Sequence, residues 1–349
     1  MNYIGSKHSI INFLEESIID FTNKEGKVFC DIFAGTGVVG KRFKQLGYNI
    51  IANDTQFYSF VLNKHYLENN NDLLFSRLKL KGIQDAFIYL NKLNNYQGFI
   101  YNNYTTLGTL NDKYERNYFT IENAIKIDSM RDQIEKWYKK EYIEKNEYYY
   151  LLACLIEAAD KVANTASVYE AFLKNMKKSA QKTIEIKPLD IIVNKNTKSK
   201  VYIEDSNELI NIIKGDILYL DPPYNSRRYS SNYHILETIA YGDSPIIKGK
   251  TGIRKESINS KYNKKNEVAK AFEELIANAK FKYIFLSYND EGIMSFKEIE
   301  EIMSKYGEYK RYETNHKRYK ASKNKEVEKK TTIEYLHALK KRDNEYESI

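Results

Sequence analysis

The chain has 349 residues, of which 42% are hydrophobic, and 55 Lys and Arg against 47 Asp and Glu give it a formal net charge of +8. A mean hydropathy of −0.62, with no long uncharged apolar run, argues against wholesale disorder and predicts a cytoplasmic protein without a signal peptide or membrane span. Only two cysteines occur and both lie in apolar runs, so neither a disulfide framework nor a metal site is predicted.

The first part of the chain predicts a βαβ unit. An amphipathic helix over 8–22 precedes an apolar strand at 27–33, a turn with glycines and a second helix. A second buried strand follows at 48–52. This order is typical of an α/β protein with a doubly wound, mostly parallel, Rossmann-like sheet.

The pattern changes at about residue 75. From 75 to 185 helical periodicity dominates, and it is clearest over 118–138 and 148–174. Strand patterns then return at 201–203, 217–220 and 283–287, with an amphipathic helix at 267–279. We therefore predict a catalytic α/β domain formed by 1–74 and 186–349, interrupted by a helical insertion at 75–185.

The glycine turn lies where an open α/β sheet binds its ligands. Asp31-Ile-Phe-Ala-Gly35-Thr-Gly37 ends the first strand, and glycines let a ligand approach the backbone closely. Asp54 ends the second strand, where a carboxylate can accept hydrogen bonds from both hydroxyls of a ribose. The turn favours a nucleotide-like ligand, although Asp54 could equally be a turn residue that caps the next helix.

A second motif, Asp221-Pro222-Pro223-Tyr224, follows the apolar strand at 217–220. Two consecutive prolines cannot continue a central strand, so the chain must leave the sheet with a carboxylate, a carbonyl and an aromatic ring in a stiff arrangement. An exocyclic amine on a planar base is a poor nucleophile, and acceptors that bind its two N–H hydrogens make it more reactive. Asp221 and the Pro222 carbonyl can be these acceptors, while Tyr224 offers a face on which an extruded base can stack.

These motifs, with Tyr3-Ile-Gly-Ser-Lys7 near the start, resemble the Dam-like group of S-adenosylmethionine-dependent DNA adenine-N6 methyltransferases. The order is also similar, because in that group a Gly-x-Lys segment comes first, a helical target-recognition insertion follows the second strand, and the catalytic tetrapeptide comes late. The segments 225–237 and 287–292 look most like the methyltransferases that accompany FokI-type restriction nucleases. The Dam enzymes carry Gly-Gly-Lys where this chain has Gly5-Ser6-Lys7, which leaves the Ser6 contact undefined.

The resemblance implies direct transfer of the methyl group of S-adenosylmethionine to N6 of a flipped-out adenine. It implies a catalytic set of Asp221, Pro222 and Tyr224. Glu204 competes with Asp205 for the position that holds the cofactor adenine. The implied cofactor-binding residues are Tyr3, Gly5, Lys7, Asp31, Phe33, Gly35, Gly37, Asp54, Asp205 and Asp221.

Positive charge is concentrated in two stretches. Residues 242–270 carry 8 basic and 3 acidic residues, and residues 305–330 carry 10 and 4. Such stretches are often only solvated loops, but in this family they predict contacts to the DNA backbone. We expect DNA contacts from Arg227, Arg228, Tyr229, Lys248, Lys250, Arg254, Lys317 and Arg318.

Four other activities remain possible from the sequence: methylation of cytosine N4, of RNA or of protein, or a non-catalytic DNA-binding regulator. Both Cys30 and Cys154 lie inside apolar segments, which argues against a cytosine-C5 mechanism with a cysteine nucleophile. We expect double-stranded DNA as the partner, a monomer, and a cognate restriction endonuclease that acts separately.

Overall fold

The computed structural model describes residues 5–78, 80, 82–224, 229–256, 260–290, 292–317 and 331–342. The chain forms two compact units. The sheet unit comprises Gly5–Thr55, Asn194–Arg228 and Asn259–Ile349, and the helical unit comprises Met1–Ile4, Gln56–Val193 and Tyr229–Ile258. The predicted insertion at 75–185 thus falls inside the helical unit, which also takes in 56–74 and 229–258.

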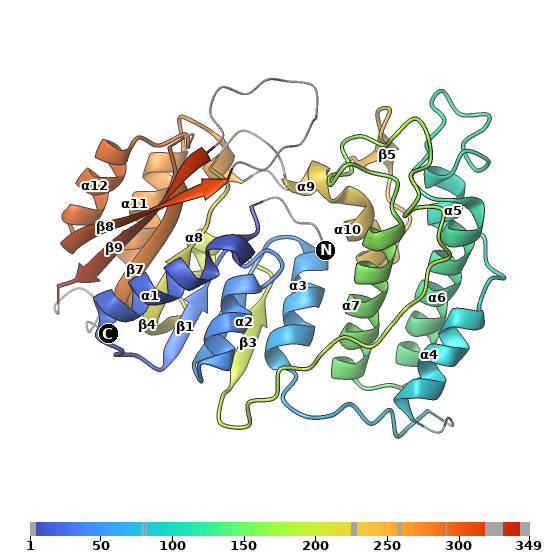
Figure 1. Cartoon of the computed structure of the whole chain (residues 1–349), viewed down its shortest axis with the longest axis horizontal. Coiled ribbons are helices and arrows are strands. Elements are labelled where there is room, and N and C mark those ends of the chain that lie inside the picture. Colours follow the sequence, from blue (N-terminus) through green and yellow to red (C-terminus); the bar gives the residue numbers. More distant parts are fainter. Residues whose placement is uncertain are drawn as a thin grey trace. The chain divides into compact units, whose positions relative to one another are not determined.

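The sheet unit is built around one seven-stranded sheet with the order β3-β2-β1-β4-β7-β9-β8 (Figure 1). The first five strands in this order are parallel, whereas β9 runs antiparallel to both β7 and β8. The strands are β1 (Val28–Asp31), β2 (Asn49–Asn53), β3 (Ser199–Tyr202), β4 (Lys214–Leu220), β7 (Lys280–Asn289), β8 (Gly307–Lys317) and β9 (Thr331–Lys341). The helices are η1 (Lys7–Ile10), α1 (Ile11–Thr22), α2 (Val38–Gln45), α8 (Ser206–Leu209), η3 (Lys261–Asn263), α11 (Val268–Asn278) and α12 (Phe296–Ser304).

Helices cover both faces of the sheet because strand side chains alternate between the faces. On one face, Cys30, Leu218 and Ile284 belong to a buried cluster with residues of α8, α11 and α12. On the other face, the ring of Phe29 stacks on Phe43 of α2 with centroids 3.8 Å apart. The α/β fold class predicted from the sequence is therefore confirmed.

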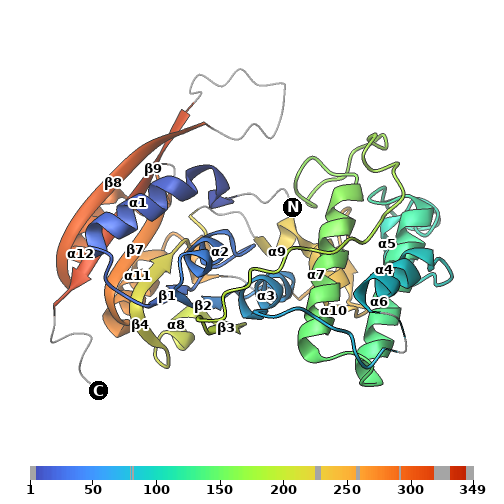
Figure 2. The same cartoon turned by 60° about the horizontal axis from the view of Figure 1, so that its bottom comes forward.

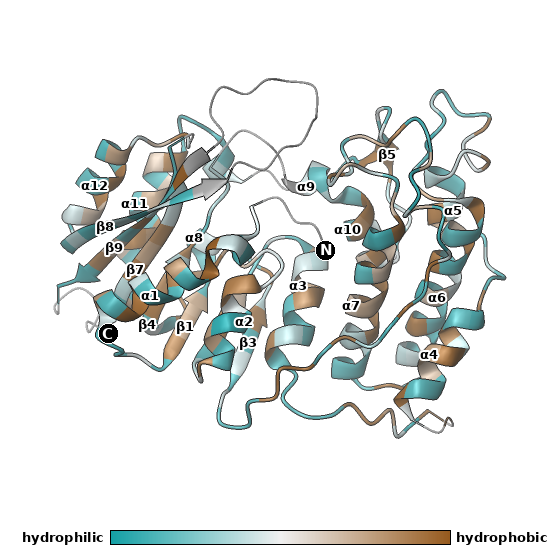
Figure 3. Cartoon of the chain, in the orientation of Figure 1, coloured by the Kyte–Doolittle hydropathy of each residue, from teal (hydrophilic) through white to brown (hydrophobic). Residues whose placement is uncertain are grey.

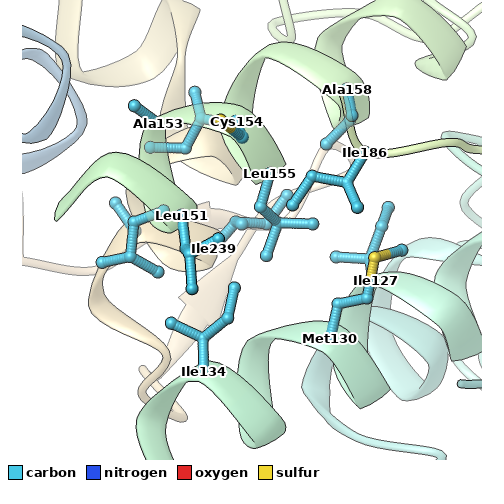
Figure 4. Packing of buried hydrophobic residues seen from close by; sticks show 14 of the residues in the cluster. Ile127, Met130, Ile134, Leu151, Ala153, Cys154, Leu155, Ala158, Ile186 and Ile239 are labelled. Atoms are coloured by element: carbon cyan, nitrogen blue, oxygen red, sulfur yellow. The ribbon is translucent and has the colours of Figure 1, made fainter. Parts of the chain in front are cut away.

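The helical unit consists of packed helices with a short two-stranded ribbon. Its core includes Ile127, Leu151, Leu155 and Ile239, which lie together in Figure 4. Hydrophobic residues also gather along α10 (Figure 3). The elements are α3 (Phe57–Asn63), η2 (Lys64–Glu68), α4 (Ile83–Lys92), α5 (Phe99–Tyr104), α6 (Ile121–Lys139), α7 (Lys145–Val162), α9 (Tyr229–Asn232), α10 (His234–Tyr241), β5 (Ile247–Lys248) and β6 (Ile253–Arg254).

Two sequence-based expectations differ from the structure. The helix predicted over 148–174 ends at Val162, because the side-chain amide of Asn164 donates hydrogen bonds to the carbonyls of Asn117 and Leu173 and turns the chain. The strands β8 and β9 were not predicted, and they form the long antiparallel pair seen in Figure 2. No helix among the described residues is both long and apolar enough to cross a membrane.

Candidate active site

The site forms at the edge of the sheet where the parallel strands end. In the register of β1 and β4, Asp31 pairs with Tyr219, so Asp221 follows two residues beyond that pair. Asp31 and Asp221 therefore leave the sheet at the same edge, although 190 positions of sequence separate them. The predicted glycine turn and the predicted tetrapeptide are thus neighbours in space.

A buried ion pair joins the tetrapeptide to the first helix. Lys7, at the start of η1, places Nζ 3.1 Å from Oδ1 of Asp221. The Lys7 side chain is only 6% exposed and that of Asp221 is 17% exposed. The same ammonium lies 5.7 Å from the centroid of the Tyr224 ring. Lys7, predicted only as a cofactor contact, is therefore also a direct partner of the predicted catalytic carboxylate.

Burial shapes the electrostatics of this pair. Burial raises the pKa of Asp221 to about 6, although Lys7 opposes this shift. Burial alone would lower the pKa of Lys7, but the carboxylates of Asp221 and Glu334 raise it above its usual value. Lys7 is therefore charged at neutral pH, and its positive charge favours the ionised form of Asp221.

The rest of the tetrapeptide is fixed by its neighbours. Pro222 is buried, and the backbone carbonyl of Tyr224 accepts a hydrogen bond from the N–H of Ile293 at 3.0 Å. The Tyr224 ring meets Tyr288 of β7 edge to face, with centroids 6.1 Å apart. Tyr224 itself is partly exposed, so its ring combines a fixed position with an accessible surface.

The glycine turn has a backbone conformation that suits glycine. Gly35 and Gly37 have φ angles of 50° and 74°, in the left-handed region that favours glycine. The Gly35 N–H donates to Oδ2 of Asp54 at 2.8 Å, so Asp54 ties the end of β2 to the turn. Asp54 does not cap α3, whose N-cap is Gln56. The structure thus gives Asp54 a contact within the turn, and its contact to a ribose stays a prediction.

Asp31 has a buried oxygen atom that a ligand could contact. It is 2% exposed, and among the described residues its Oδ1 has no hydrogen-bond partner. Burial, together with the nearby carboxylates of Asp221 and Asp54, raises the pKa of Asp31 well above its usual value. A cationic or N–H donor group of a ligand would satisfy this oxygen, and such a group fits the predicted cofactor.

The structure gives less direct support for the residues predicted at the adenine end of the cofactor site. Asp205 is the N-cap of α8, and its Oδ1 accepts hydrogen bonds from the N–H groups of Asn207 and Glu208. Phe33 is half-buried and meets the ring of Tyr262 edge to face at 5.0 Å. Tyr262 was not predicted, because it joins this region only through the packing of η3.

The predicted DNA contacts fall into three groups. Lys248 and Lys250 are exposed on the ribbon of β5 and β6. Arg254, in contrast, donates to both carboxylate oxygens of Asp243, at 2.8 and 2.6 Å, and lies over the Tyr241 ring. Arg227, Arg228 and Arg318, and the side chains of Tyr229 and Lys317, lie outside the described residues, as does Tyr3, which was predicted to bind the cofactor.

Three buried residues anchor the ribbon, and two of them, Arg116 and Tyr104, were not predicted. The guanidinium of Arg116 donates to the carbonyls of Gly249 and Lys250, and the Tyr104 hydroxyl donates to the carbonyl of Gly252 at 2.8 Å. His234 is fully buried, with Nε2 2.9 Å from the carbonyl of Thr251. The ribbon therefore presents its lysines from a fixed backbone. Arg116 and Tyr104 each lie more than a hundred residues before the carbonyls that they contact, and a single His is weak evidence by itself. No local sequence signal could therefore reveal these contacts.

Comparison with known proteins identifies the chemistry of this site. Residues 3–303 match the D12 class N6 adenine-specific DNA methyltransferase family. The chain belongs to this family. It is 47% identical to the type II methyltransferase M.NlaIII of Neisseria lactamica, over 98% of this chain and 99% of that protein. It is 35% identical to M.CviAII of Paramecium bursaria Chlorella virus 1, over 92% and 93% of the two chains.

The methyltransferase is also 41% identical to M.FokI of Planomicrobium okeanokoites, over 98% of this chain but 53% of that protein. It therefore spans about half the length of that relative. Family membership confirms the resemblance found in the sequence. The substrate of this family is DNA, and its product is N6-methyladenine. Cytosine N4, RNA, protein and a non-catalytic role are thereby set aside.

Proposed function

We propose that this methyltransferase moves the methyl group of S-adenosylmethionine to N6 of an adenine flipped out of duplex DNA, at one short recognition sequence. The observation that carries the proposal is the buried Lys7–Asp221 pair at the start of the Asp-Pro-Pro-Tyr segment. It supplies an ionised acceptor beside a rigid carbonyl and a partly exposed ring. S-adenosylmethionine would supply an electrophilic methyl group on a sulfonium.

The chain's own residues would do the rest. Asp221 and the carbonyl of Pro222 would accept hydrogen bonds from the two N–H groups of N6, which aims the nitrogen lone pair at the methyl group. N6 would lose one of these two protons to solvent once the methyl group is attached. Tyr224 would stack on the flipped base, worth about 1–3 kcal/mol by analogy with single-strand binding. Asp31, with its unpartnered oxygen, and the Gly35–Gly37 turn would hold the cofactor.

The direct test is to incubate the purified protein with S-adenosylmethionine and unmethylated DNA of mixed sequence, and to map modified bases by single-molecule sequencing. N6-methyladenine at one short motif is the expected result. Unmodified DNA from a protein that binds S-adenosylmethionine would contradict the proposal. The same data give the recognition sequence.

The rate of methyl transfer should fall in acid. Only ionised Asp221 accepts an N–H hydrogen well, and because its pKa is raised to about 6, the rate should be lost as the pH drops through that value and be constant above it. This is tested by measuring the single-turnover rate as a function of pH on preformed complexes of the enzyme, DNA and S-adenosylmethionine. In Asp221→Asn the residual rate should lack this acid limb, and a limb that stays in place would contradict the assignment.

The helical unit, in this proposal, contacts the DNA target through the ribbon of β5 and β6. Replacing Lys248 and Lys250 together by alanine should weaken DNA binding and reduce the slope of log affinity against log salt by up to about 2. Fluorescence anisotropy over a salt series measures the slope. The control is Lys139→Ala/Lys140→Ala, which removes equal charge from exposed positions at the end of α6. Equal slopes for the two variants would contradict this surface.

We further propose that the protein acts as a monomer and protects DNA from a separate restriction endonuclease. The type II names of its relatives support this role. Analytical ultracentrifugation, and a search for cleavage at the mapped motif by a separate protein of the same source, would test the two parts independently.

A further inference from the structure

A third carboxylate faces the Lys7–Asp221 pair. Glu334 lies near the start of β9 and pairs in register with Asn289, near the end of β7. Because β9 runs antiparallel to β7, its first residues lie at the edge of the sheet where the parallel strands end. Glu334 is 7% exposed, and its Oε2 lies 3.8 Å from Nζ of Lys7.

Lys7 supplies the positive charge that faces Glu334. Among the described residues its Oε2 has no hydrogen-bond donor, and Lys7 is its ion-pair partner. A buried carboxylate is costly unless a positive charge compensates it. The family match ends at residue 303, before Glu334.

Lys7 therefore stands between two carboxylates from different parts of the chain. It donates to Asp221 at 3.1 Å and attracts Glu334 at 3.8 Å. A lysine side chain has four rotatable carbon–carbon bonds, so one ion pair alone holds it loosely. The negative charge of Glu334 restricts the position of the Lys7 ammonium. The same charge also reduces the effect of Lys7 on the charge of Asp221.

We propose that Glu334 is a positioning residue for methyl transfer, which acts through Lys7 to hold the ammonium against Asp221 while leaving Asp221 able to accept a hydrogen bond from the target amine. This inference rests on the proposed function. Glu334 touches neither the base nor the methyl donor in this scheme. Its effect is on the rate of transfer and on the protonation of Asp221.

The sign of the effect on pH follows from the charges. The negative charge of Glu334 raises the pKa of Asp221, whereas Lys7 lowers it. In Glu334→Gln this negative charge is lost, while burial, Lys7, Asp31 and Tyr219 still act on Asp221, so the pKa of Asp221 falls. The acid limb of the rate profile should therefore move to lower pH in this variant.

The experiment compares the full-length wild type with Glu334→Gln in single-turnover methylation of unmethylated plasmid DNA across the acid limb. We expect a plateau rate lower by about tenfold and an acid limb at lower pH, with S-adenosylmethionine and DNA affinities changed less than about twofold. Glu334→Asp keeps the charge but places it farther from Lys7, so its limb should lie between those of the wild type and Glu334→Gln. The control Glu308→Gln, at an exposed position of β8, should match the wild type.

Three results would overturn the inference: a wild-type rate and limb in Glu334→Gln, a lower rate with an unmoved limb, or a loss confined to S-adenosylmethionine affinity. The last would mean that Glu334 binds the methyl donor. If Glu334→Gln does not fold, as judged by thermal unfolding, the limb of Glu334→Asp decides, because a shorter side chain that moves farther from Lys7 should shift it partway. Failure of the proposed function itself would appear separately, as a wild type that methylates no adenine.

Discussion

Replacing Asp221 by asparagine is expected to lower the single-turnover rate of adenine methylation by about 10²-fold to 10⁴-fold while the protein still binds S-adenosylmethionine. The reason is that Asp221 supplies a charged acceptor at the reacting nitrogen, and an interaction made with the reacting group affects the rate more than ground-state binding. Asparagine keeps the size of the side chain and still offers an oxygen to Lys7, which lies 3.1 Å from Oδ1.

Asparagine is a better test than alanine. Alanine would leave the buried ammonium of Lys7 without its closest partner, and breaking a buried pair in this way costs about 3–5 kcal/mol. A loss of activity in Asp221→Ala would then mix chemistry with folding. In Asp221→Asn the two are separable when thermal unfolding is recorded beside the rate.

The measurement is transfer of a labelled methyl group to DNA that carries the mapped motif, with calorimetry for S-adenosylmethionine binding. The matched control is Asp132→Asn, which removes a carboxylate from a surface ion pair with Lys136 and should leave the rate unchanged. An Asp221→Asn enzyme with the wild-type rate would refute the role given to Asp221.

The sequence could predict the parts of the site that lie at strand ends. The strands β1, β2 and β4 are short apolar runs that are followed by the glycine turn, by Asp54 and by the Asp-Pro-Pro-Tyr segment. Such turn signals can be recognised from the local sequence alone. Once the strands are parallel neighbours, Asp31 and Asp221 must meet at one edge. The fold class and the position of the site follow from these local signals.

The contacts that hold the site could not be predicted in this way. β8 carries mostly charged, tyrosine and other polar side chains, and it lies in the basic stretch 305–330 that was interpreted as contacting DNA. β9 lies beyond that stretch and was not recognised as a strand. Glu334 meets Lys7 only because β9 returns antiparallel beside β7, a pairing set by the whole sheet. Tyrosine and lysine are abundant throughout the chain, so their presence at a given position carried little information.

The same limit applies in the helical unit, where Arg131 is the strongest example. Arg131 is 7% exposed on α6, and its guanidinium donates to the last three carbonyls of α10, those of Ile239, Ala240 and Tyr241. The ends of helices leave such carbonyls without partners inside the helix. In the sequence Arg131 is one basic residue in an amphipathic segment, with nothing to mark it as a cap for a helix over a hundred residues away.

Replacing Arg131 by methionine should therefore destabilise the protein by about 3–5 kcal/mol, because a side chain of similar length leaves the buried carbonyls of α10 without donors. It also removes one of three partners of Glu135, which Arg131 contacts at 2.9 Å and which Tyr148 and Lys139 contact as well. Urea unfolding measures the loss of stability, and hydrogen exchange of the α10 amides shows whether it is local to that helix.

The control for Arg131→Met is Arg77→Met in the same unit. The Arg77 side chain is 54% exposed and pairs with Glu144 at 3.2 Å, so its loss should cost no more than about 1 kcal/mol. Equal stabilities for the two variants would show that α10 ends without help from α6. If Arg131→Met is unstable as expected, DNA binding should weaken with it, because α10 leads directly into the ribbon that carries Lys248 and Lys250.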